Sequence, residues 1–310
     1  MKIGLIKPNF PNEKRVALLP EHIIDFENEL IVENNFGEYM DIPNFEYENR
    51  NCIIKDRETI LRECDVIFSL KLIQQVDYKF LRPGQMIIGW THPSGSGAKF
   101  IKEQAIPKNL IIVDLDNIYP FIHYMQGKID IGFLKPNFIW KNSYMAGFSS
   151  TMHAILAQGI VPNANTRVAI LACGNVSQGA YAAISKFNPD IRLYYRKTMH
   201  EFKESIADFD IIINGIEMDN DIEHIVNNEE IKLLKSKCLL IDAAADAGRA
   251  IESTRYTSID NPLYYENDVY FYVVNNSPSI FYRESSYIIS QSFSKHIFKK
   301  NIKRFYALLK

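Results

Sequence analysis

The chain has 310 residues, of which 47% are hydrophobic, and its formal net charge is −2 at pH 7. This amount of apolar material is enough for two domains with separate cores. A nearly neutral chain lacks the broad positive surface that binds nucleic acids or anionic membranes, so we expect neither as a partner. An anionic ligand must then be bound by a local cluster of cations.

The cysteines indicate a reducing compartment. Cys52, Cys64, Cys173 and Cys238 are far apart and form no CxxC pair, which argues against a zinc site and against a disulfide framework. No apolar stretch reaches the length of a membrane span, and the N-terminal residues read as a strand rather than as a secretion signal. We therefore expect a cytoplasmic protein without a metal site and without a membrane partner.

The first half of the chain alternates strand-like and helical segments. Strand-like hydrophobic runs occupy residues 2–7, 30–36, 65–71, 86–92 and 110–116. One helix is expected to open at Pro20, and another covers residues 57–63. This alternation is typical of βαβ units, in which parallel strands form one sheet.

A second alternating series begins after a connecting helix. Residues 142–159 have the length of a helix and contain many small side chains, and Pro162 follows as a helix breaker. Strand-like runs then occupy residues 167–172, 191–196, 210–215 and 238–244, with helical segments between them, which predicts a doubly wound sheet. A hairpin-like segment follows, and the last helical stretch, 284–309, is expected to pack back on the first domain.

A dinucleotide-binding loop is suggested where the strand-like run 167–172 passes into a helix. In the GxGxxG fingerprint the first glycine makes a tight turn, the second lets the pyrophosphate approach the backbone, and the third lets the helix lie close to the strand. Gly174 occupies the middle position, and small residues replace the other two glycines. The loop predicted to hold the pyrophosphate at the helix N-terminus is Ala172, Cys173, Gly174, Asn175, Val176 and Ser177. An ordinary strand-to-helix turn is the alternative interpretation.

The end of the next strand bears on the choice of cofactor. An NAD site usually has an acidic residue there, about twenty residues after the glycines, which holds the ribose hydroxyls. This chain has Arg196, Lys197 and Thr198 instead. Two cations and a hydroxyl suit the 2′-phosphate of NADPH, so we predict NADPH as the cofactor. A solvated basic turn capped by Thr198 would explain the same residues.

These features together predict an α/β protein with two doubly wound parallel-sheet domains. Residues 1–141, completed by 283–310, would form a substrate domain that carries catalytic groups. Residues 142–282 would form a Rossmann NADP-binding domain. We expect the active-site cleft to lie between the two.

Three side chains follow strand-like runs of the first half. Arg15 lies in the loop after the first run, Lys71 ends the run 65–71, and His92 ends the run 86–92. Ligands of open α/β sheets bind at the carboxyl ends of strands, so we expect these side chains to face one cleft, where Arg15 can clamp a carboxylate. Taken singly, each is more often a solvated or structural group.

Two carboxylates compete for a role in the second half. Asp242 lies within a buried strand and is interpreted as structural, whereas Asp246 follows that strand and is the functional candidate. Asp246 alone would also be consistent with a turn or helix cap.

Together these segments resemble the alanine dehydrogenase and pyridine nucleotide transhydrogenase family over nearly the whole chain. The resemblance rests on the opening IGLIKPNFPNEKRVALLPEHI, on WTHP, on LIDAAADAG and on VVNNSP. It implies that Arg15 binds the carboxylate of a keto acid and that Lys71 is a substrate-binding and catalytic lysine. It further implies that His92 is the catalytic histidine, that Asp246 is the catalytic aspartate near the nicotinamide, and that Asn276 lies beside the nicotinamide.

Within this family, the runs SLKLIQ, QMIIGWTHPSGSG, YYRKTM, DIIINGIE and DAAADAG are most similar to the N(5)-(carboxyethyl)ornithine synthases. That resemblance implies an NADPH-dependent oxidoreductase acting on CH–NH donors, which joins pyruvate to the side-chain amine of ornithine or of lysine. Reduction of the resulting imine would use hydride from the nicotinamide. We also expect a homo-oligomer.

Three other functions stay open on the sequence alone. An alanine dehydrogenase would use ammonia, although those enzymes are longer and carry a full glycine fingerprint followed by an acidic residue. A saccharopine dehydrogenase-like enzyme would use a larger keto diacid. A non-catalytic nucleotide-binding sensor would explain the altered glycine loop, but it would have no physical need of Lys71, His92 and Asp246 together.

Overall fold

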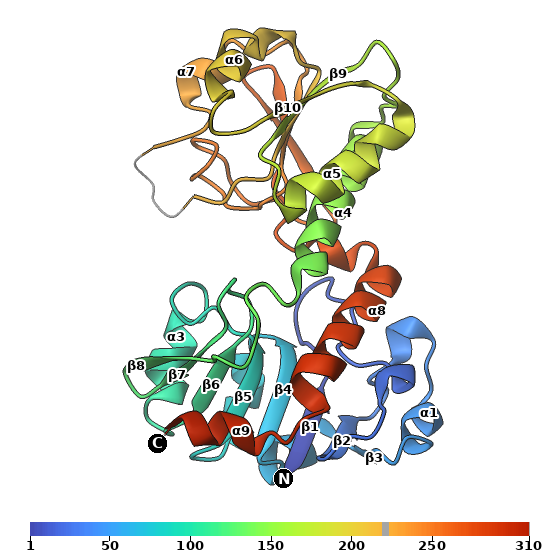
Figure 1. The fold of residues 1–310 in the computed structure, drawn as a ribbon, viewed down its shortest axis with the longest axis vertical. Helices are drawn as coiled ribbons and strands as arrows, with labels where there is room; N and C mark the ends of the chain where they lie inside the picture. The colour runs from blue at the N-terminus through green and yellow to red at the C-terminus, as the bar shows by residue number, and fades with distance from the viewer. Residues whose placement is uncertain (219–222, 310) are drawn as a thin grey trace. The chain divides into compact units, whose positions relative to one another are not determined.

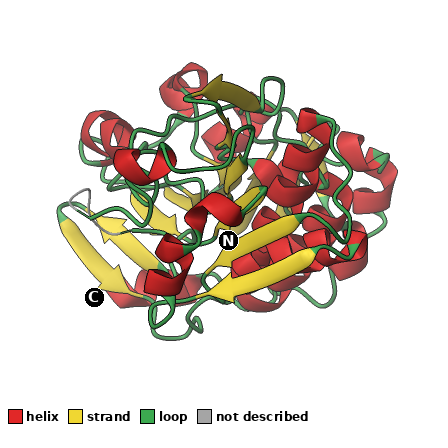
Figure 2. Cartoon of the chain, turned by 90° about the horizontal axis from the view of Figure 1, so that it is seen from above, coloured by secondary structure: helices red, strands yellow, loops and turns green. Residues whose placement is uncertain are grey.

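A computed structural model describes residues 1–218 and 223–309. The chain divides into two compact units: the first unit consists of Met1–Ile139 and the segment that begins at Tyr282, and the second unit is Trp140–Phe281. Each unit has one sheet with helices on both of its faces (Figure 1). Figure 2 shows the strands in yellow, bordered by red helices. The predicted α/β fold class is confirmed.

The sheet of the first unit has the strand order β3-β2-β1-β4-β5-β6-β7-β8. The first six strands of that order are parallel, and β7 and β8 extend the sheet as an antiparallel hairpin that the sequence did not predict. The strands are β1 Lys2–Ile6, β2 Glu29–Glu33, β3 Ile53–Lys55, β4 Val66–Lys71, β5 Met86–Trp90, β6 Ile111–Asp114, β7 Phe121–Tyr124 and β8 Gly127–Asp130.

Short helices and the C-terminal segment cover the first sheet. The α-helices are α1 Asn44–Glu48, α2 Arg57–Glu63, α3 Ala98–Phe100, α8 Tyr282–Phe293 and α9 Lys303–Tyr306. The 3₁₀ and π turns are η1 Pro20–His22, η2 Glu38–Met40, η3 Gln75–Phe80, η4 Ile101–Ala105, η8 Ser294–Phe298 and η9 Ala307–Leu309. The predicted C-terminal helix 284–309 is therefore interrupted by the π turn η8 and resumes only as a short helix.

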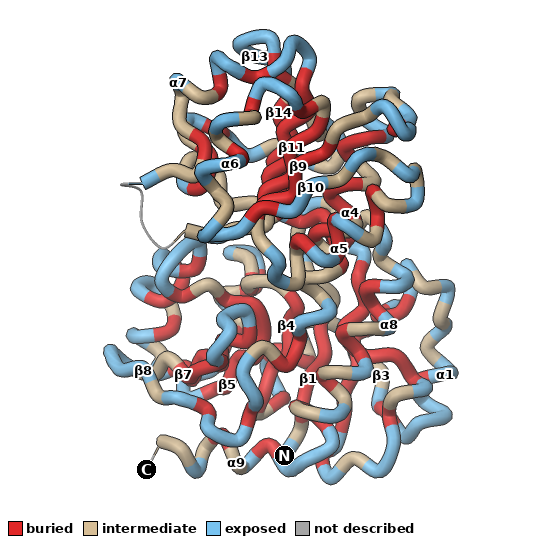
Figure 3. The backbone as a smooth tube through the Cα atoms, turned by 45° about the horizontal axis from the view of Figure 1, so that its top comes forward, coloured by how far each residue is buried: buried red, intermediate tan, exposed pale blue. Residues whose placement is uncertain are grey.

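The central strands of the first unit are hydrophobic along their whole length because helices cover both sides of the sheet. On one side, Phe293 and Phe298 of the C-terminal segment contact Phe68 of β4, with ring centroids 5.0 and 4.9 Å apart. On the other side, Ile60 and Phe100 belong to a second buried cluster. Figure 3 shows β1, β4 and β5 as buried backbone.

The second unit repeats this architecture on a smaller sheet of order β10-β9-β11-β12-β14-β13, in which only β13 is antiparallel to its neighbour. Its strands are β9 Arg167–Leu171, β10 Asp190–Tyr194, β11 Ile211–Asn214, β12 Leu239–Asp242, β13 Leu263–Glu266 and β14 Val269–Tyr272. Its helices and turns are α4 Trp140–Gln158, α5 Asn175–Ile184, η5 Ser185–Phe187, α6 Met199–Glu204, η6 Ile206–Asp208, α7 Asn228–Ile231 and η7 Ser277–Ser279.

The small residues of α4 serve close helix packing. A Cβ atom on Gly147 of α4 would lie 1.8 Å from the carbonyl oxygen of Val176, and one on Gly179 of α5 would lie 1.8 Å from the carbonyl oxygen of Tyr144. Only glycine therefore allows the two backbones to touch. Gly179 thus packs α5 against α4 and takes no part in the turn between β9 and α5.

No helix within residues 1–218 and 223–309 combines the length and the apolar composition that a membrane span requires.

Candidate active site

The first sheet has a topological switch point between β1 and β4. From β1 the chain continues to β2 and β3 on one side, whereas β4, β5 and β6 lie on the other. Ligands of such sheets bind outside the carboxyl ends of the strands at this point, where the flanking connections diverge. The structure brings the carboxyl ends of β4 and β5 together there, and with them Lys71 and His92.

A bulge at the end of β4 determines where Lys71 lies. The pairing register between β4 and β5 shifts between Ser69 and Lys71, so that Lys71 stands opposite Trp90. The Ser69 hydroxyl donates to the Lys71 carbonyl oxygen at 2.6 Å and holds the bulged turn. A bulge re-aims the side chain that follows it. The Lys71 ammonium lies 5.6 Å from the centroid of the Trp90 ring.

Arg15 is buried and pairs with Glu13, a residue that the sequence analysis did not select. Its Nε and Nη2 donate to the two carboxylate oxygens of Glu13 at 2.8 and 2.6 Å, and both side chains are at most 1% exposed. The guanidinium also stacks on Trp90 with its carbon 4.7 Å from the ring centroid. Burial alone would raise the pKa of Glu13, but the charge and hydrogen bonds of Arg15 and the charge of Lys71 bring that pKa below its ordinary value.

Lys71 shares the same environment. Its Nζ is 3.9 Å from Oε2 of Glu13, and its side chain is 14% exposed. Burial, aided by the charge of Arg15, lowers the pKa of Lys71 to about 8, although Glu13 and Asp116 act in the opposite direction. A lysine with a pKa near neutrality can change its protonation state under ordinary conditions, which is typical of functional sites.

His92 forms a pair with Asp116, the second carboxylate that the sequence analysis did not select. Nδ1 of His92 lies 3.0 Å from Oδ2 of Asp116. The hydrogen bond to Asp116 raises the pKa of His92, against the effect of burial. Burial by itself would raise the pKa of Asp116, yet His92, Lys71 and Arg15 together lower it. The imidazole is therefore oriented, and its protonated form is stabilised.

The backbone of His92 is held in an unusual conformation. Its φ angle is 44°, in the left-handed region that non-glycine residues rarely adopt. The carboxylate of Asp114, at the end of β6, accepts hydrogen bonds from the backbone N–H groups of Thr91 and His92 at 2.9 and 3.2 Å. Gly97 packs against the same turn, because a Cβ there would lie 2.0 Å from the Thr91 carbonyl oxygen.

The sequence analysis missed two carboxylates, Asp116 and Glu13, and only one of them lies in a pattern that it had used. Asp116 follows strand β6, which neighbours β5, so the reasoning that selected Lys71 and His92 applies to it equally. Glu13 lies in an irregular loop, and only the rule that a buried guanidinium needs an anionic partner would have suggested it.

In the second unit, the predicted pyrophosphate loop connects β9 to α5. Ala172 has a φ of 80°, so the first position of the fingerprint keeps a glycine-like turn although it holds alanine. Gly174 caps α5 without a side-chain hydrogen bond to the first turn, and a Cβ added there would meet nothing within 4 Å. Gly174 is exposed, so this helix N-terminus is open to an anionic ligand on the side of the glycine.

Ser177 fills the place of the third glycine. Its hydroxyl is buried and donates to the Leu171 carbonyl oxygen of β9 at 2.9 Å. The serine fits because Gly215 faces it, and a Cβ on Gly215 would lie 2.2 Å from the Ser177 hydroxyl oxygen. The chain therefore compensates for the altered fingerprint with a glycine directly after the neighbouring strand β11.

The basic residues after β10 lie on the same edge of the second sheet. Thr198 closes the turn, since its hydroxyl accepts the Tyr195 N–H at 3.1 Å. Arg196 and Lys197 are exposed, and neither forms a salt bridge with another residue of the described part of the chain. Their charges are available to an anionic ligand.

The other predicted cofactor-side residues follow β12 and β14. The Asp246 carboxylate is 15% exposed, accepts the Met218 N–H at 3.3 Å and lies 3.6 Å from Arg249. Asp242 is buried, where it accepts from Asn214 at 2.9 Å and from the Asp246 N–H at 3.2 Å, and burial raises the pKa of Asp242 to about 6. Asn276 is buried and precedes the turn η7. These positions and the loop 172–177 follow parallel strands of one sheet and share its carboxyl edge.

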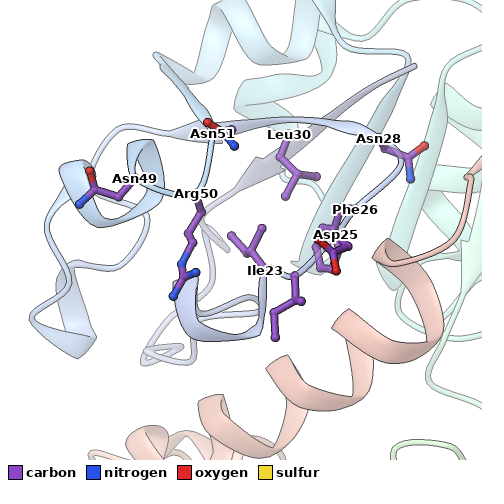
Figure 4. A pocket seen from close by; sticks show the side chains of 9 residues that line it. Ile23, Asp25, Phe26, Asn28, Leu30, Asn49, Arg50 and Asn51 are labelled. Carbon is purple, nitrogen blue, oxygen red and sulfur yellow. The ribbon is translucent and has the colours of Figure 1, made fainter.

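Two of the cavities that the described residues form lie in the first unit. One, of about 280 Å³, borders Arg15. The other, of about 370 Å³, lies at the amino ends of β2 and β3 and contains none of the predicted site residues; Figure 4 shows Arg50, Asp25 and Ile23 around it. In the described residues, no group of three or more histidine, cysteine, aspartate or glutamate side chains is arranged to hold a metal ion.

Family models match both halves of the chain. Residues 4–120 match "Alanine dehydrogenase/PNT, N-terminal domain", and residues 146–309 match "Alanine dehydrogenase/PNT, C-terminal domain", where PNT stands for pyridine nucleotide transhydrogenase. The chain belongs to this family. As a member of the alanine dehydrogenase/PNT family it is an oxidoreductase, and the predicted family resemblance is confirmed.

Curated relatives within the family cover the whole chain. The N(5)-(carboxyethyl)ornithine synthase of Clostridium botulinum is 56% identical over 302 residues, which are 97% of this chain and 95% of that protein. The enzyme of the same name from Lactococcus lactis subsp. lactis is 50% identical over 310 residues, covering 100% of this chain and 99% of that one. Alanine dehydrogenase 1 of Staphylococcus aureus is only 26% identical, over 94% of this chain and 85% of its own length.

Solved structures of alanine dehydrogenase/PNT proteins share the fold. An L-alanine dehydrogenase superposes with a TM-score of 0.82 at 15% identity, covering 99% of this chain and 92% of that one. A transhydrogenase from Sinorhizobium meliloti has a TM-score of 0.75 at 16% identity, over 95% and 92% of the two chains.

Proposed function

We propose that this oxidoreductase condenses pyruvate with the side-chain amine of ornithine, or of lysine, and reduces the product with NADPH to an N-(1-carboxyethyl) amino acid. The observation that carries the proposal is the cluster of Lys71, His92 and their carboxylates at the switch point of the first sheet. The names of the relatives that are 50–56% identical support this choice of amine and product. The balanced reaction consumes pyruvate, the amine, NADPH and a proton, and yields the secondary amine, water and NADP⁺.

Arg15 and Lys71 are proposed to bind the keto acid. Arg15 and Lys71 share the single carboxylate of Glu13, so these three side chains together carry a net positive charge, which suits an incoming carboxylate. A Lys71 pKa of about 8 keeps most of the amine protonated at pH 7, so that it can donate a hydrogen bond to the substrate and polarise its carbonyl. Activity that needs charged Lys71 should fall as the pH rises through about 8.

His92 is proposed to be the general acid and base. Condensation of an amine with a ketone forms a carbinolamine and then loses water, and both steps move protons at the former carbonyl oxygen. Asp116 holds Nδ1 of His92 and raises the pKa of the ring, which leaves Nε2 to exchange the proton. Histidine is the side chain that most often performs such proton transfers, provided that it is positioned at the reacting group.

The second unit has features that fit NADPH. The uncapped helix end behind Gly174 suits the pyrophosphate, and the exposed Arg196 and Lys197 suit the 2′-phosphate. Asp246 and Asn276 would lie at the nicotinamide end of the same sheet edge. When bound, NADPH supplies the hydride. All four cysteines are free, which supports the cytoplasm as its location.

The test is NADPH oxidation with pyruvate and each of four additions: ornithine, lysine, ammonia, or no amine. We expect turnover only with ornithine or lysine, together with a product whose mass is that of the secondary amine. NADH in place of NADPH should be a poor reductant, because the 2′-phosphate is then absent.

Other results would contradict the proposal in distinct ways. Turnover with ammonia alone would make the chain an alanine dehydrogenase. Turnover only with a keto diacid would favour a saccharopine dehydrogenase-like enzyme. Tight NADPH binding with no turnover under any of these conditions would favour a nucleotide sensor.

A further inference from the structure

The cavity beside Arg15 has charged walls of both signs. It measures about 280 Å³, and its charged and hydrogen-bonding borders are Lys7, Asn9, Arg15, Glu33, Glu38, Tyr39 and Arg57. Lys7 follows β1 and Glu33 ends β2, so the cavity lies at the carboxyl edge of the first sheet. In strand order, that edge leads from Glu33 through Lys7 directly to Lys71 on β4.

A partly buried network fixes the backbone of Lys7. Arg57 binds both oxygens of Asp77 at 2.9 and 2.7 Å and also contacts Glu33 at 2.9 Å. The Lys7 N–H donates to Glu33 at 2.6 Å, and Arg57 donates to the Lys7 carbonyl oxygen at 2.8 Å. Burial raises the pKa of Glu33, in opposition to the charges of Arg57 and Lys7. The backbone N–H and the carbonyl oxygen of Lys7 are thus both held in place by the network.

The Lys7 and Glu38 side chains form the more open part of the cavity. Nζ of Lys7 lies 3.2 Å from Oε1 of Glu38, and these side chains are 28% and 43% exposed. An exposed ion pair of this kind contributes only about 0–1 kcal/mol. A ligand that offers one positive and one negative charge can therefore separate the pair at small cost and bind both ends.

We propose that this cavity binds the α-amino acid head group of the amine substrate, with the α-carboxylate at Lys7 and the α-ammonium at Glu38. The inference rests on the proposed function, since it assigns the site of the second substrate. Neighbouring strands are about 4.8 Å apart, so an extended side chain of three or four methylenes reaches from the end of β1 toward Lys71 and His92. Arg15 borders both places.

Two truncated amines test which charge each residue binds. Putrescine is ornithine without its α-carboxylate, and 5-aminopentanoate is ornithine without its α-amine. For Lys7→Met we expect kcat/KM with ornithine to fall about 10–100-fold, because a charge-assisted hydrogen bond contributes about 1.5–3 kcal/mol, while the value with putrescine stays within about twofold. For Glu38→Gln we expect the same pattern, with 5-aminopentanoate as the unaffected substrate.

The control is a second exposed ion pair of the same unit. Lys99 and Glu103 are 4.0 Å apart on the helix surface, with side chains 67% and 48% exposed. Lys99→Met and Glu103→Gln should leave all three amines unchanged. The KM for pyruvate should stay constant in all four variants, which separates a defect in the amine site from a defect in the keto-acid site.

Two outcomes would overturn the inference. If the wild-type enzyme requires ornithine but Lys7→Met loses as much activity with putrescine as with ornithine, Lys7 only anchors its loop and the subsite is wrong, while the proposed function stands. If the wild-type enzyme reduces pyruvate with ammonia alone, the proposed function fails and the subsite fails with it.

Discussion

The candidate site residues of the two units are held in place by different kinds of interaction. In the first unit the site is built from charged side chains in contact: Arg15 and Lys71 with Glu13, and His92 with Asp116. Neighbouring charges shift the pKa values of Glu13, Lys71, His92 and Asp116. In the second unit, the loop 172–177 is shaped by backbone turns, and Arg196 beside it is exposed. The effect of a substitution in the first unit's site should therefore extend to the neighbouring charged side chains. A substitution in the cofactor region should affect only the residue that is changed.

The largest effect is expected from Glu13→Gln. The change leaves the buried guanidinium of Arg15 without its anionic partner and brings two cations together without a carboxylate. Removing one partner of a buried ion pair costs about 3–5 kcal/mol. Denaturant unfolding of the whole protein at pH 7 should show this loss of stability. The matched change Glu58→Gln, at a side chain that is 54% exposed, should cost little.

The loss in Glu13→Gln should depend on pH in one direction. The folded-state pKa of Glu13 lies below its ordinary value of 4.5. Its contribution to the free energy of unfolding is therefore present above that value and is lost as the pH falls through the folded-state pKa. An equal difference between wild type and variant at pH 7 and at strongly acidic pH would show that the pair does not stabilise the unit.

Lys71→Ala should lower kcat/KM by about 10²–10³-fold, the effect of removing one preorganised donor from a charge-stabilising site. Folding and NADPH affinity should persist, because the substituted residue belongs to the first unit and the predicted nucleotide loop to the second. Lys99→Ala, at a highly exposed position, is the control. Wild-type kcat/KM in Lys71→Ala would remove this lysine from the proposed mechanism.

Arg196→Gln tests the cofactor region. One charge-assisted contact to the 2′-phosphate is lost, so KM for NADPH should rise about 10–100-fold. KM for NADH and the unfolding midpoint should stay unchanged, because the side chain is exposed. Arg192→Gln, at an exposed position in β10, is the matched control. An equal rise in KM for both cofactors would mean that Arg196 does not bind the 2′-phosphate.

The fold was predictable from the sequence where strands are continuous hydrophobic runs. Runs such as VIFSLK and RVAIL became the buried strands β4 and β9. The antiparallel hairpin β7–β8 was missed, since β7 is only four residues long and β8 is mostly exposed and of mixed composition. The break of the C-terminal helix at η8 was missed as well, because a single π turn cannot be recognised from the hydrophobic periodicity of the sequence.

The positions of residues at strand ends predicted part of the candidate site, whereas the rest depends on how loops and helices pack in the folded chain. Lys71 and His92 were selected because they end strands, and the sheet brings them together. Glu13 comes from a loop whose conformation depends on packing, and no local pattern shows that it faces Arg15. The compensation between Ser177 of α5 and Gly215, which follows β11, likewise joins positions far apart in the chain, which a single sequence does not reveal.

Asp116→Asn should have the smallest effect on turnover and the most specific one on pH dependence. Asp116 orients His92 without contacting the carbonyl oxygen in the proposed mechanism, so kcat/KM at pH 7 should fall only about tenfold, less than removal of the general acid itself. The hydrogen bond that His92 donates to Asp116 is the main cause of the raised pKa of His92, and the variant should therefore lower that pKa. NMR titration of the His92 imidazole, assigned with His92→Gln, measures this shift separately from the titration of Lys71. Asp130→Asn, at an exposed position in β8, should shift nothing, and a His92 pKa equal in Asp116→Asn and wild type would show that the two side chains are not coupled.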